Sequence, residues 1–407
     1  MKILHTSDWH LGKSLGSISR HPEQVEVLNE ICEIADKEQV NAVIVAGDLF
    51  DTFNPPVESI ELFYRTLKRL ANDGKRVVIA IAGNHDSPER VESPDPLARE
   101  CGIIFLGYPH TKTPTFSLPS GLQVTRSDEG FVEVVVPGQT QALRLITTPY
   151  ANEKRLRSYL GIENPEEQLR NILQTRWNST GEKYCDENGV NILTAHLYLA
   201  SRLGEKFEEP EDEKPILDVG GAQAVFLENL PDGIQYVALG HLHRRIKMQD
   251  RNVPVIYSGS PLSYSMSEAD QEKAVTIVEV TPGKAAATKE IPLHSGRRVH
   301  RKSFDSVTEA IAWLQGNPNT LVELTIISDT YLTADQRKSL TSAHDGIVDV
   351  IPQVKNAEEG AGAVITPANL SESVEDLFKE FFKHEKNQEP NGEMINLLRE
   401  IMKVEEE

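Results

Sequence analysis

Carboxylate, amide and imidazole side chains gather in four short stretches, each where a buried strand should end. The side chains in question are Asp8, His10, Asp48, Asn84, His241 and His243. A ligand set of this kind, with no thiolate, favours a borderline ion such as manganese, iron or zinc over calcium. There are more groups than one tetrahedral ion needs, so the pattern predicts two ions about 3.5 to 4 Å apart acting on a phosphoester.

The spacing of these residues suggests how they could meet. Residues i and i+2 of an extended backbone point to one face, roughly 6 to 7 Å apart, so Asp8 with His10, and His241 with His243, can bracket a metal position. Asp48, our candidate bridging carboxylate, follows a helix of ordinary βαβ length. Because open α/β sheets bind ligands at the carboxyl ends of strands, one shared site is the simpler interpretation.

Alone, each stretch is weak evidence, and it is the ordered co-occurrence that favours a site. Other polar residues keep a structural interpretation. Asp51 and Asp86 are expected to cap turns or support ligands. The histidines interpreted as ordinary polar residues are His5, His21, His110, His294, His300, His344 and His384.

The elements that must position these groups follow an α/β rhythm. The first third alternates apolar strands with helical patterns, which predicts βαβ units and a largely parallel sheet. Later strands follow more closely and predict a mixed sheet, until Pro282 and Gly283 mark a break. We therefore expect a catalytic domain over residues 1–285, a small α+β module over 290–365 and an amphipathic helical tail over 366–407.

Composition places the chain among soluble globular proteins, with 39% hydrophobic and 26% charged residues in 407. It has neither an apolar run of membrane-spanning length nor a secretory apolar segment near its start, so we expect it in the cytoplasm. The cysteines Cys32, Cys101 and Cys185 lack any CxxC pattern, so they predict neither a disulfide framework nor a thiolate zinc site.

A formal net charge of −20 argues against a chain that holds nucleic acid by its overall field. Metal ions would supply positive charge locally, and a partner subunit could supply a basic track. Arg20, Arg244 and Arg245 near the motifs are either DNA contacts or ordinary surface cations.

The motifs DxH, GDxxD, GNHD and GHxH, in that order, resemble those of the calcineurin-like metallophosphoesterases. Longer stretches are similar to the SbcD family, the nuclease subunits of bacterial complexes with the coiled-coil ATPase SbcC. These stretches are KILHTSDWHLG, VIVAGDLFDTFNPP, AGNHDSP, YVALGHLHR and YSGSPLSYS. The resemblance covers nearly the whole chain. It implies a mixed β-sandwich flanked by helices, a capping α+β domain that contacts DNA, and a helical tail that docks on the partner.

The same resemblance implies the role of each site residue. One metal would be held by Asp8, His10, Asp48 and His243, and the other by Asp48, Asn84, His196 and His241. His196 is taken from the resemblance alone, and the preceding residue is Ala195 where many relatives have glycine. His85 matches a histidine that is not a ligand but stabilises the transition state or protonates the leaving oxygen. The alternative for His85 is a group that only orients the site.

The resemblance implies double-strand exonuclease and single-strand or hairpin endonuclease activity with two divalent ions, usually Mn²⁺. This activity would serve DNA repair, recombination and replication, and would depend on ATP through an SbcC-type coiled-coil ATPase, with the chain a homodimer in a heterotetramer. Two alternatives stay open. The chain could be a phosphodiesterase or phosphatase for other phosphoesters, or an architectural DNA-tethering protein whose metals are structural. The tail's apolar face could also pack on the chain's own core.

Overall fold

The structure, a computed structural model, describes residues 1–160, 164–201, 225–248, 252–328 and 332–354, with six positions beyond 377. One compact unit comprises Met1–Ile326 and Ala334–Ile351, and a second comprises Ile327–Thr333 and Pro352–Glu407. Nearly all of the tail expected over 366–407 lies outside the described residues. Among the described residues, no helix has the length and apolar character that a membrane span requires.

The first sheet contains the βαβ units predicted for the first third of the chain. Its six strands run in the order β18-β17-β1-β4-β5-β6. Their bounds are β1 Lys2–Thr6, β4 Ala42–Ala46, β5 Val77–Ile81, β6 Ile103–Leu106, β17 Ala274–Glu279 and β18 Ala287–Pro292. β1, β4, β5 and β6 are parallel, whereas β17 and β18 are antiparallel additions. The sheet thus continues through β18, past position 285.

The second sheet is mixed, as the closer spacing of the later strands predicts. Its eight strands run in the order β15-β16-β14-β11-β10-β9-β8-β7. β10, β11, β14 and β16 are parallel, and the outer strands are antiparallel. The bounds are β7 Phe116–Ser117, β8 Gln123–Asp128, β9 Phe131–Val135, β10 Leu143–Thr148, β11 Val190–His196, β14 Tyr236–Gly240, β15 Ile246–Met248 and β16 Val255–Tyr257.

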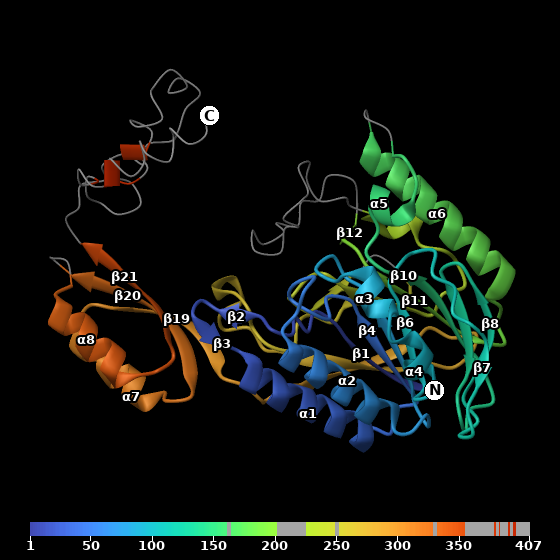
Figure 1. The fold of residues 1–407 in the computed structure, drawn as a ribbon, viewed down its shortest axis with the longest axis horizontal. Helices are drawn as coiled ribbons and strands as arrows, with labels where there is room; N and C mark the ends of the chain where they lie inside the picture. The colour runs from blue at the N-terminus through green and yellow to red at the C-terminus, as the bar shows by residue number, and fades with distance from the viewer. Residues whose placement is uncertain are drawn as a thin grey trace. The chain divides into compact units, whose positions relative to one another are not determined.

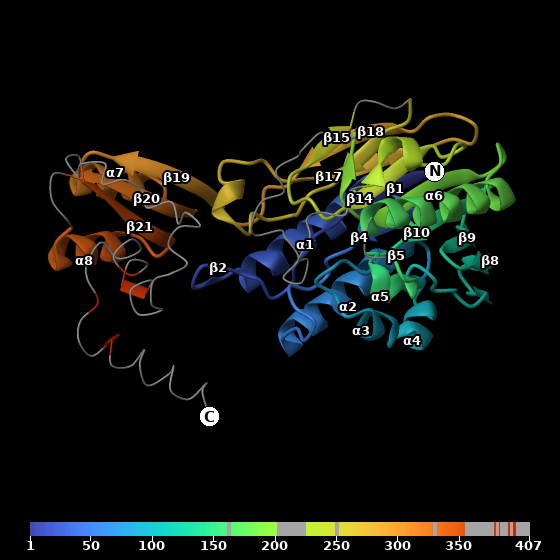
Figure 2. The same ribbon diagram turned by 90° about the horizontal axis from the view of Figure 1, so that it is seen from above.

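The two sheets pack face to face, and helices cover their outer faces (Figures 1 and 2). Alternate residues of each inner strand point to opposite sides, so Ile44 of β4 joins the core between the sheets while Val43 and Val45 pack beneath helices. α1 (His21–Lys37) and α2 (Val57–Ala71) cover the first sheet. α6 (Pro165–Tyr184) covers the second. The predicted mixed β-sandwich flanked by helices is therefore confirmed.

Hydrophobic spacing explains why α2 forms and which face it buries. Ser59, Phe63, Leu67 and Leu70 recur at intervals of three and four and are buried, while the charged positions between them are exposed. The helix ends at Asn72, whose left-handed backbone (φ 47°) stops the hydrogen-bond ladder. Short elements complete the main body: β2 Ser14–Leu15, β3 Ile18–Ser19, α3 Pro88–Glu92, α4 Asp95–Arg99, α5 Glu153–Leu156, β12 Leu199–Ala200 and β13 Val225–Phe226.

After the sandwich the chain forms an α+β module, as the sequence predicts. Its strands form one sheet in the order β19-β20-β21. The bounds are β19 Arg298–Phe304, α7 Val307–Gly316, β20 Thr320–Ser328, α8 Ala334–Ala343 and β21 Ile347–Val354. Leu15 of the β2-β3 hairpin packs with Val299 and Leu321 in a small apolar cluster. The hairpin that follows His10 thus contacts this module.

Candidate metal centre

The carboxyl ends of strands from both sheets bring the predicted site residues together. Asp8 and His10 follow β1, Asp48 follows β4, and Asn84 follows β5 in the first sheet. His196 ends β11 of the second sheet, and β14 leads directly into the GHLH stretch. Because β1, β4 and β5 are neighbours and β11 pairs with β14, the two sheets present these ends to one region.

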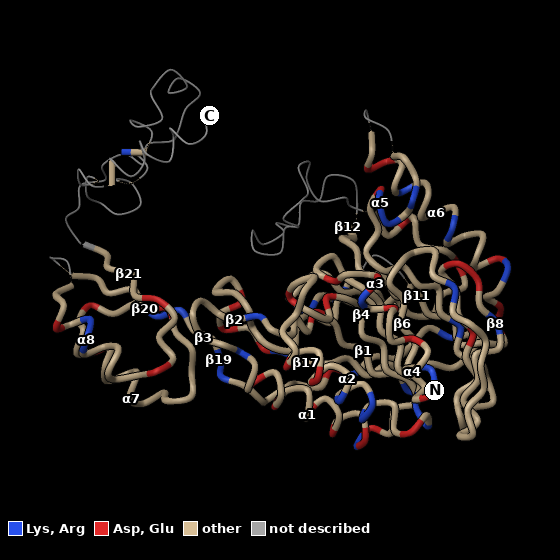
Figure 3. The backbone as a smooth tube through the Cα atoms, viewed as in Figure 1, with Lys and Arg blue, Asp and Glu red and all other residues tan. Residues whose placement is uncertain are grey.

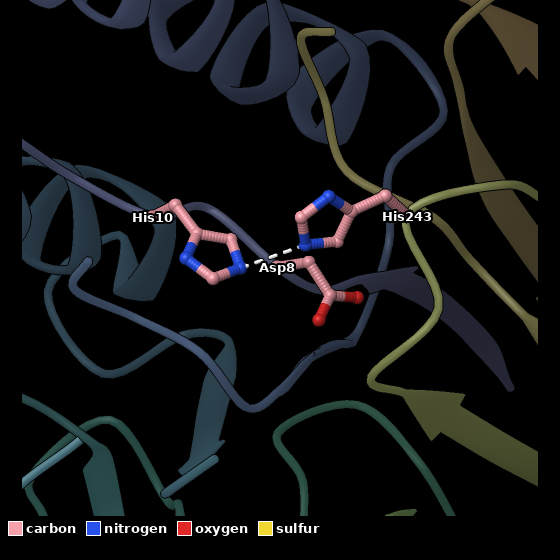
Figure 4. Close-up of side chains that lie close together, drawn as sticks. All are labelled: Asp8, His10 and His243. Carbon is pink, nitrogen blue, oxygen red and sulfur yellow. Dashed lines mark hydrogen bonds between the residues drawn. The ribbon is translucent and has the colours of Figure 1, made fainter. Parts of the chain in front are cut away.

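Asp8, His10 and His243 form the first cluster of candidate ligands (Figure 4). Their ligand atoms lie within 4.8 Å of one another, and all three residues are buried. The Nε2 atoms of His10 and His243 are 2.9 Å apart and face each other. Two imidazole lone pairs at this distance repel unless a proton or a cation lies between them, so the arrangement fits a metal ion.

A second cluster forms around the side-chain amide of Asn84. Its Oδ1 lies 2.9 Å from Nε2 of His196 and 3.2 Å from Nδ1 of His241. The Nδ1 atom of His196 lies 2.9 Å from the carbonyl oxygen of Ala46, which fixes the ring with Nε2 toward the cluster. An amide oxygen and two imidazoles are ligands that a borderline divalent ion accepts.

Asp48 lies between the two clusters. Its Oδ2 atom is 3.4 Å from Nε2 of His10 and 3.4 Å from Nε2 of His196. One carboxylate oxygen therefore faces an imidazole of each cluster at the same distance. A carboxylate shared by two ions needs this placement.

The charges of the centre are set by burial and by the neighbours of each group. Burial alone would raise the pKa of Asp48, but the adjacent His196, His85 and His10 hold that pKa well below its usual range. Burial likewise opposes protonation of His196, yet Asp48 and Asp8 raise its pKa to about 9. Burial lowers the pKa of His10 to about 3. Buried ionisable groups need compensating charge, which divalent cations provide.

His85 occupies the rim of the centre and is half-buried. Its backbone N–H donates to Oδ1 of Asp48 over 2.9 Å, and its Nδ1 lies 2.9 Å from the carbonyl oxygen of Asp51. Because a carbonyl can only accept, Nδ1 carries the proton in the neutral ring. The other nitrogen, Nε2, then carries the lone pair.

Comparisons with known proteins identify the family of the chain. A family model described as calcineurin-like phosphoesterase matches residues 1–245. The SbcD subunit of the nuclease SbcCD from Bacillus subtilis is 35% identical over 415 aligned residues, which cover 100% of this chain and 99% of that protein. The protein of the same name from Rhodobacter capsulatus is 33% identical, covering 72% of this chain and 69% of its own length.

The chain belongs to the SbcD family of calcineurin-like phosphoesterases. It is thus an enzyme, a hydrolase of phosphodiester bonds, and its site is one for divalent metal ions. Among solved structures, a dimetal phosphatase from Danio rerio matches with 10% identity and a TM-score of 0.38, covering 73% of this chain and 99% of its own.

The backbone of this phosphoesterase corrects one expectation about spacing. β1 ends at Thr6 and β14 at Gly240, and Asp8 (φ 52°), His10 (φ 42°) and His241 (φ 106°) have left-handed rather than extended backbones. The extended-strand argument for the DxH and HxH pairs is therefore wrong. The two histidines of HxH face different clusters, because the turn after β14 sends His241 to Asn84 and His243 to His10.

Asp86 behaves as the turn-capping group that the sequence predicts. Its carboxylate accepts hydrogen bonds from the backbone N–H groups of Leu49, Phe50 and Gly83, over 3.0, 3.0 and 2.7 Å. It thereby ties the loop after β5 to the loop after β4. Asp51 contacts Lys13 at 3.0 Å and lies 3.5 Å from Nδ1 of His10, as expected of a supporting group.

Arg155 of α5 is a site residue that the sequence did not reveal. Its guanidinium is buried and donates to the carbonyl oxygens of Gly83 (2.7 Å), Asp86 (2.8 Å) and Asn84 (3.4 Å). The loop that carries Asn84 and His85 is therefore fixed by a side chain from a distant helix. Nothing in its local sequence separates Arg155 from the other arginines of that stretch.

The three arginines considered as DNA contacts have different surroundings. Arg20 is fully buried and its Nη2 lies 2.9 Å from Oε2 of Glu23, so interpreting it as a surface cation or a DNA contact is wrong. Arg245 forms an ion pair with Glu290 at 2.8 Å. Arg244 is exposed. α2 carries acidic residues in its first half and basic residues in its second half, whereas α6 carries both signs in each half (Figure 3).

Proposed function

We propose that this chain is the metal-dependent nuclease component of a complex with an SbcC-type coiled-coil ATPase, and that it cleaves DNA with Mn²⁺. The observation that carries the proposal is the placement of Asp48 Oδ2, 3.4 Å from one imidazole of each cluster. A carboxylate shared between two ligand sets would hold two ions close enough together for in-line cleavage of a phosphodiester. Similarity over the full length to the SbcD subunit of the nuclease SbcCD supports the choice of substrate and partner.

In this proposal each cluster holds one ion. The first is bound by Asp8, His10, Asp48 and His243, and the second by Asp48, Asn84, His196 and His241. The chemistry that such a pair supplies is activation of a water and neutralisation of charge on the phosphate. Imidazole, carboxylate and amide ligands without thiolate suit manganese.

The role of the protein itself in the reaction is to orient groups and to move a proton. His85 is the proposed catalytic residue. The carbonyl of Asp51 holds its Nδ1–H, so donation from the other nitrogen requires the doubly protonated ring, whose Nε2–H would protonate the leaving oxygen or stabilise negative charge on the phosphate. Arg155 keeps the loop in place through three backbone carbonyls.

The partner and the DNA track belong to the same proposal. The net charge of −20 leaves little general attraction for DNA, so the ATPase would supply much of the basic surface. We propose that the module at 290–365 caps the site and touches DNA, that the tail at 366–407 docks on the ATPase, and that the chain works as a homodimer within a heterotetramer. Its setting would be the cytoplasm, where its free cysteines, Cys32, Cys101 and Cys185, stay reduced.

In the test, the purified chain is incubated with Mn²⁺, both with and without its ATPase and ATP. Three substrates are offered: linear duplex DNA, a DNA hairpin and bis-p-nitrophenyl phosphate. We expect the parent to cleave the DNA substrates, a folded Asp48→Asn variant to cleave none of them, and a folded His85→Gln variant to cleave them much more slowly. Turnover of the chromogenic ester with DNA untouched, even with the ATPase present, would favour a phosphoesterase for other substrates. If both variants cut at the parent rate, a structural role for the metals gains and the catalytic assignment fails.

A further inference from the structure

Glu268 is a buried carboxylate beside a candidate ligand, outside the set of residues assigned so far. It ends the short 3₁₀ helix η2 (Met266–Glu268) and is 2% exposed. Its Oε1 atom lies 3.3 Å from Nδ1 of His243. The opposite ring nitrogen of His243 is the one that faces His10 across the first cluster.

The orientation of the Glu268 carboxylate is fixed from several directions. Backbone N–H groups of Tyr264 and Ser265 donate to Oε1 over 2.9 and 3.2 Å. The hydroxyl of Ser260 donates to Oε2 over 3.1 Å, and Lys273 forms an ion pair with the same oxygen. Lys273 also donates to the carbonyl of His243 over 3.1 Å. The carboxylate cannot turn away from the histidine without breaking these contacts.

This contact determines which nitrogen of His243 can bind a cation. A carboxylate accepts, so the proton of the neutral ring lies on Nδ1 and the lone pair lies on Nε2, toward His10 and Asp8. The imidazole of His196 is oriented differently, because its Nδ1 faces the neutral carbonyl of Ala46. A charged acceptor makes a ligating imidazole more basic than a neutral one does.

We propose that Glu268 is a positioning residue that fixes the tautomer of His243 and sets the affinity of the first metal site. Lys273 keeps the carboxylate paired, so that Glu268 supports the ligand rather than binding the ion itself. The inference rests on the proposed two-metal function, and it adds a reason why the two sites should bind Mn²⁺ with different affinities. The first site depends on Glu268, and the Asn84 site does not.

The experiment compares two buried carboxylates in the full-length chain. Glu268→Gln is the test variant. Glu23→Gln is the matched control, because Glu23 is also buried and ion-paired, to Arg20 and Arg297, but contacts no candidate ligand. Binding of Mn²⁺ without DNA is measured by isothermal titration calorimetry. Unfolding temperature in EDTA reports the stability of each metal-free protein.

We expect Glu268→Gln to weaken one of two Mn²⁺ sites by about 10- to 100-fold while the other keeps the parent affinity. Glu23→Gln should unfold at a lower temperature in EDTA yet bind both ions as the parent does. Parent-like affinity at both sites in Glu268→Gln would overturn the inference, as would an equal loss in Glu23→Gln.

A second variant covers the case in which Glu268→Gln does not fold. Glu268→Asp keeps the charge and the lysine pair but withdraws the carboxylate from His243, so a several-fold loss at one site is expected, and the parent affinity there would overturn the inference. The proposed function is judged separately, on the parent alone. If the parent binds both ions but does not cut DNA, the proposed nuclease function is contradicted. The role of Glu268 is then still decided by the comparison of Mn²⁺ affinities.

Discussion

His10 and His196 are both buried imidazoles 3.4 Å from the same carboxylate oxygen, yet their pKa values move in opposite directions. Burial dominates at His10, and the nearby His243 and His85 add to it, which lowers its pKa to about 3. At His196 the attraction of Asp48 and Asp8 exceeds the effect of burial and raises the pKa to about 9. Residue type alone therefore does not fix the charge of a group in this centre, because its neighbours decide it.

Substitution of His85 should separate catalysis from metal binding. His85→Gln is expected to lower DNA cleavage by about 10²- to 10⁴-fold, because a proton donor is lost, while two Mn²⁺ ions still bind. Asp48→Asn, by contrast, should lose both DNA cleavage and Mn²⁺ binding, since Asp48 faces both clusters. Metal content measured by mass spectrometry and cleavage of a labelled duplex check the two outcomes. Loss of bound manganese in His85→Gln would make His85 a ligand instead.

Protonation of His5 should make stability depend on pH. His5 is buried with Nδ1 2.7 Å from the hydroxyl of Tyr236, and burial lowers its pKa to about 3 from 6.5. In the unfolded chain His5 is therefore protonated below about pH 6.5, whereas in the folded chain it stays neutral down to about pH 3. Stability from the neutral ring is complete above the first value and is lost as pH falls through this window.

His5→Gln removes that titration. We expect the free energy of unfolding of the parent, relative to this variant, to fall by at most about 1.4 kcal/mol for each pH unit below 6.5. Urea unfolding in EDTA at pH 7, 6 and 5 measures the difference. A parent-to-variant difference that stays constant over this range would contradict the low pKa.

Strand ends in this fold rely on glycine where another segment of the chain approaches closely. A Cβ atom added to Gly240 would lie 1.9 Å from the carbonyl oxygen of Ala46, and one added to Gly83 would lie 2.1 Å from Oδ1 of Asp48. β14 of the second sheet therefore meets β4 of the first at a distance that only glycine permits. This close approach places His241 beside Asp8, to whose Oδ1 the His241 N–H donates over 3.0 Å.

Gly240→Ala should disturb the contact between the sheets. We expect destabilisation of about 3 kcal/mol from overpacking, together with weaker Mn²⁺ binding, because the clash is with backbone and cannot be relieved by a rotamer change. Chemical unfolding and metal titration measure both effects. Gly316→Ala is the control, since a Cβ there meets nothing within 4 Å and the φ angle is not left-handed. Equal stability and equal Mn²⁺ binding of the two variants would show that β14 and β4 do not approach as closely as the contact at Gly240 indicates.

The loop after β5 should depend on α5 for its position. Arg155→Lys cannot reach three carbonyls at once, so His85 and Asn84 would lose their fixed geometry and cleavage should fall by about 10²-fold. Single-turnover cleavage rates check this. Lys154→Met, an exposed change on the same helix, should cut DNA as the parent does. Parent-like rates in Arg155→Lys would mean that the loop holds its shape unaided.

The whole sandwich is needed to assemble the centre, since four candidate ligands follow strands of the first sheet and three come from the second. Ions bound between them would act as cross-links between two sheets that otherwise meet through their apolar core. Binding to the folded state alone stabilises it by mass action.

Removal of metal should therefore lower the unfolding temperature. At Mn²⁺ concentrations about 100 times the dissociation constant, each bound ion is expected to add about 2.7 kcal/mol, which EDTA should abolish. Differential scanning calorimetry in Mn²⁺ and in EDTA measures the shift. Asp48→Asn should show a much smaller shift, and a shift as large as that of the parent would argue that the ions bind elsewhere.

The ligand types, the order of strands and helices, and the family could all be predicted from the residues in chain order. These features are local, because apolar periodicity and polar residues at strand ends are written in neighbouring positions. The tertiary structure decided which cluster His241 and His243 each face. It also decided that Arg20 is buried. Finally, it brought Arg155 and Glu268 into contact with the site, where they support its residues. Those outcomes depend on left-handed turns after the strands and on how two sheets pack, and both are set by contacts between residues far apart in the chain.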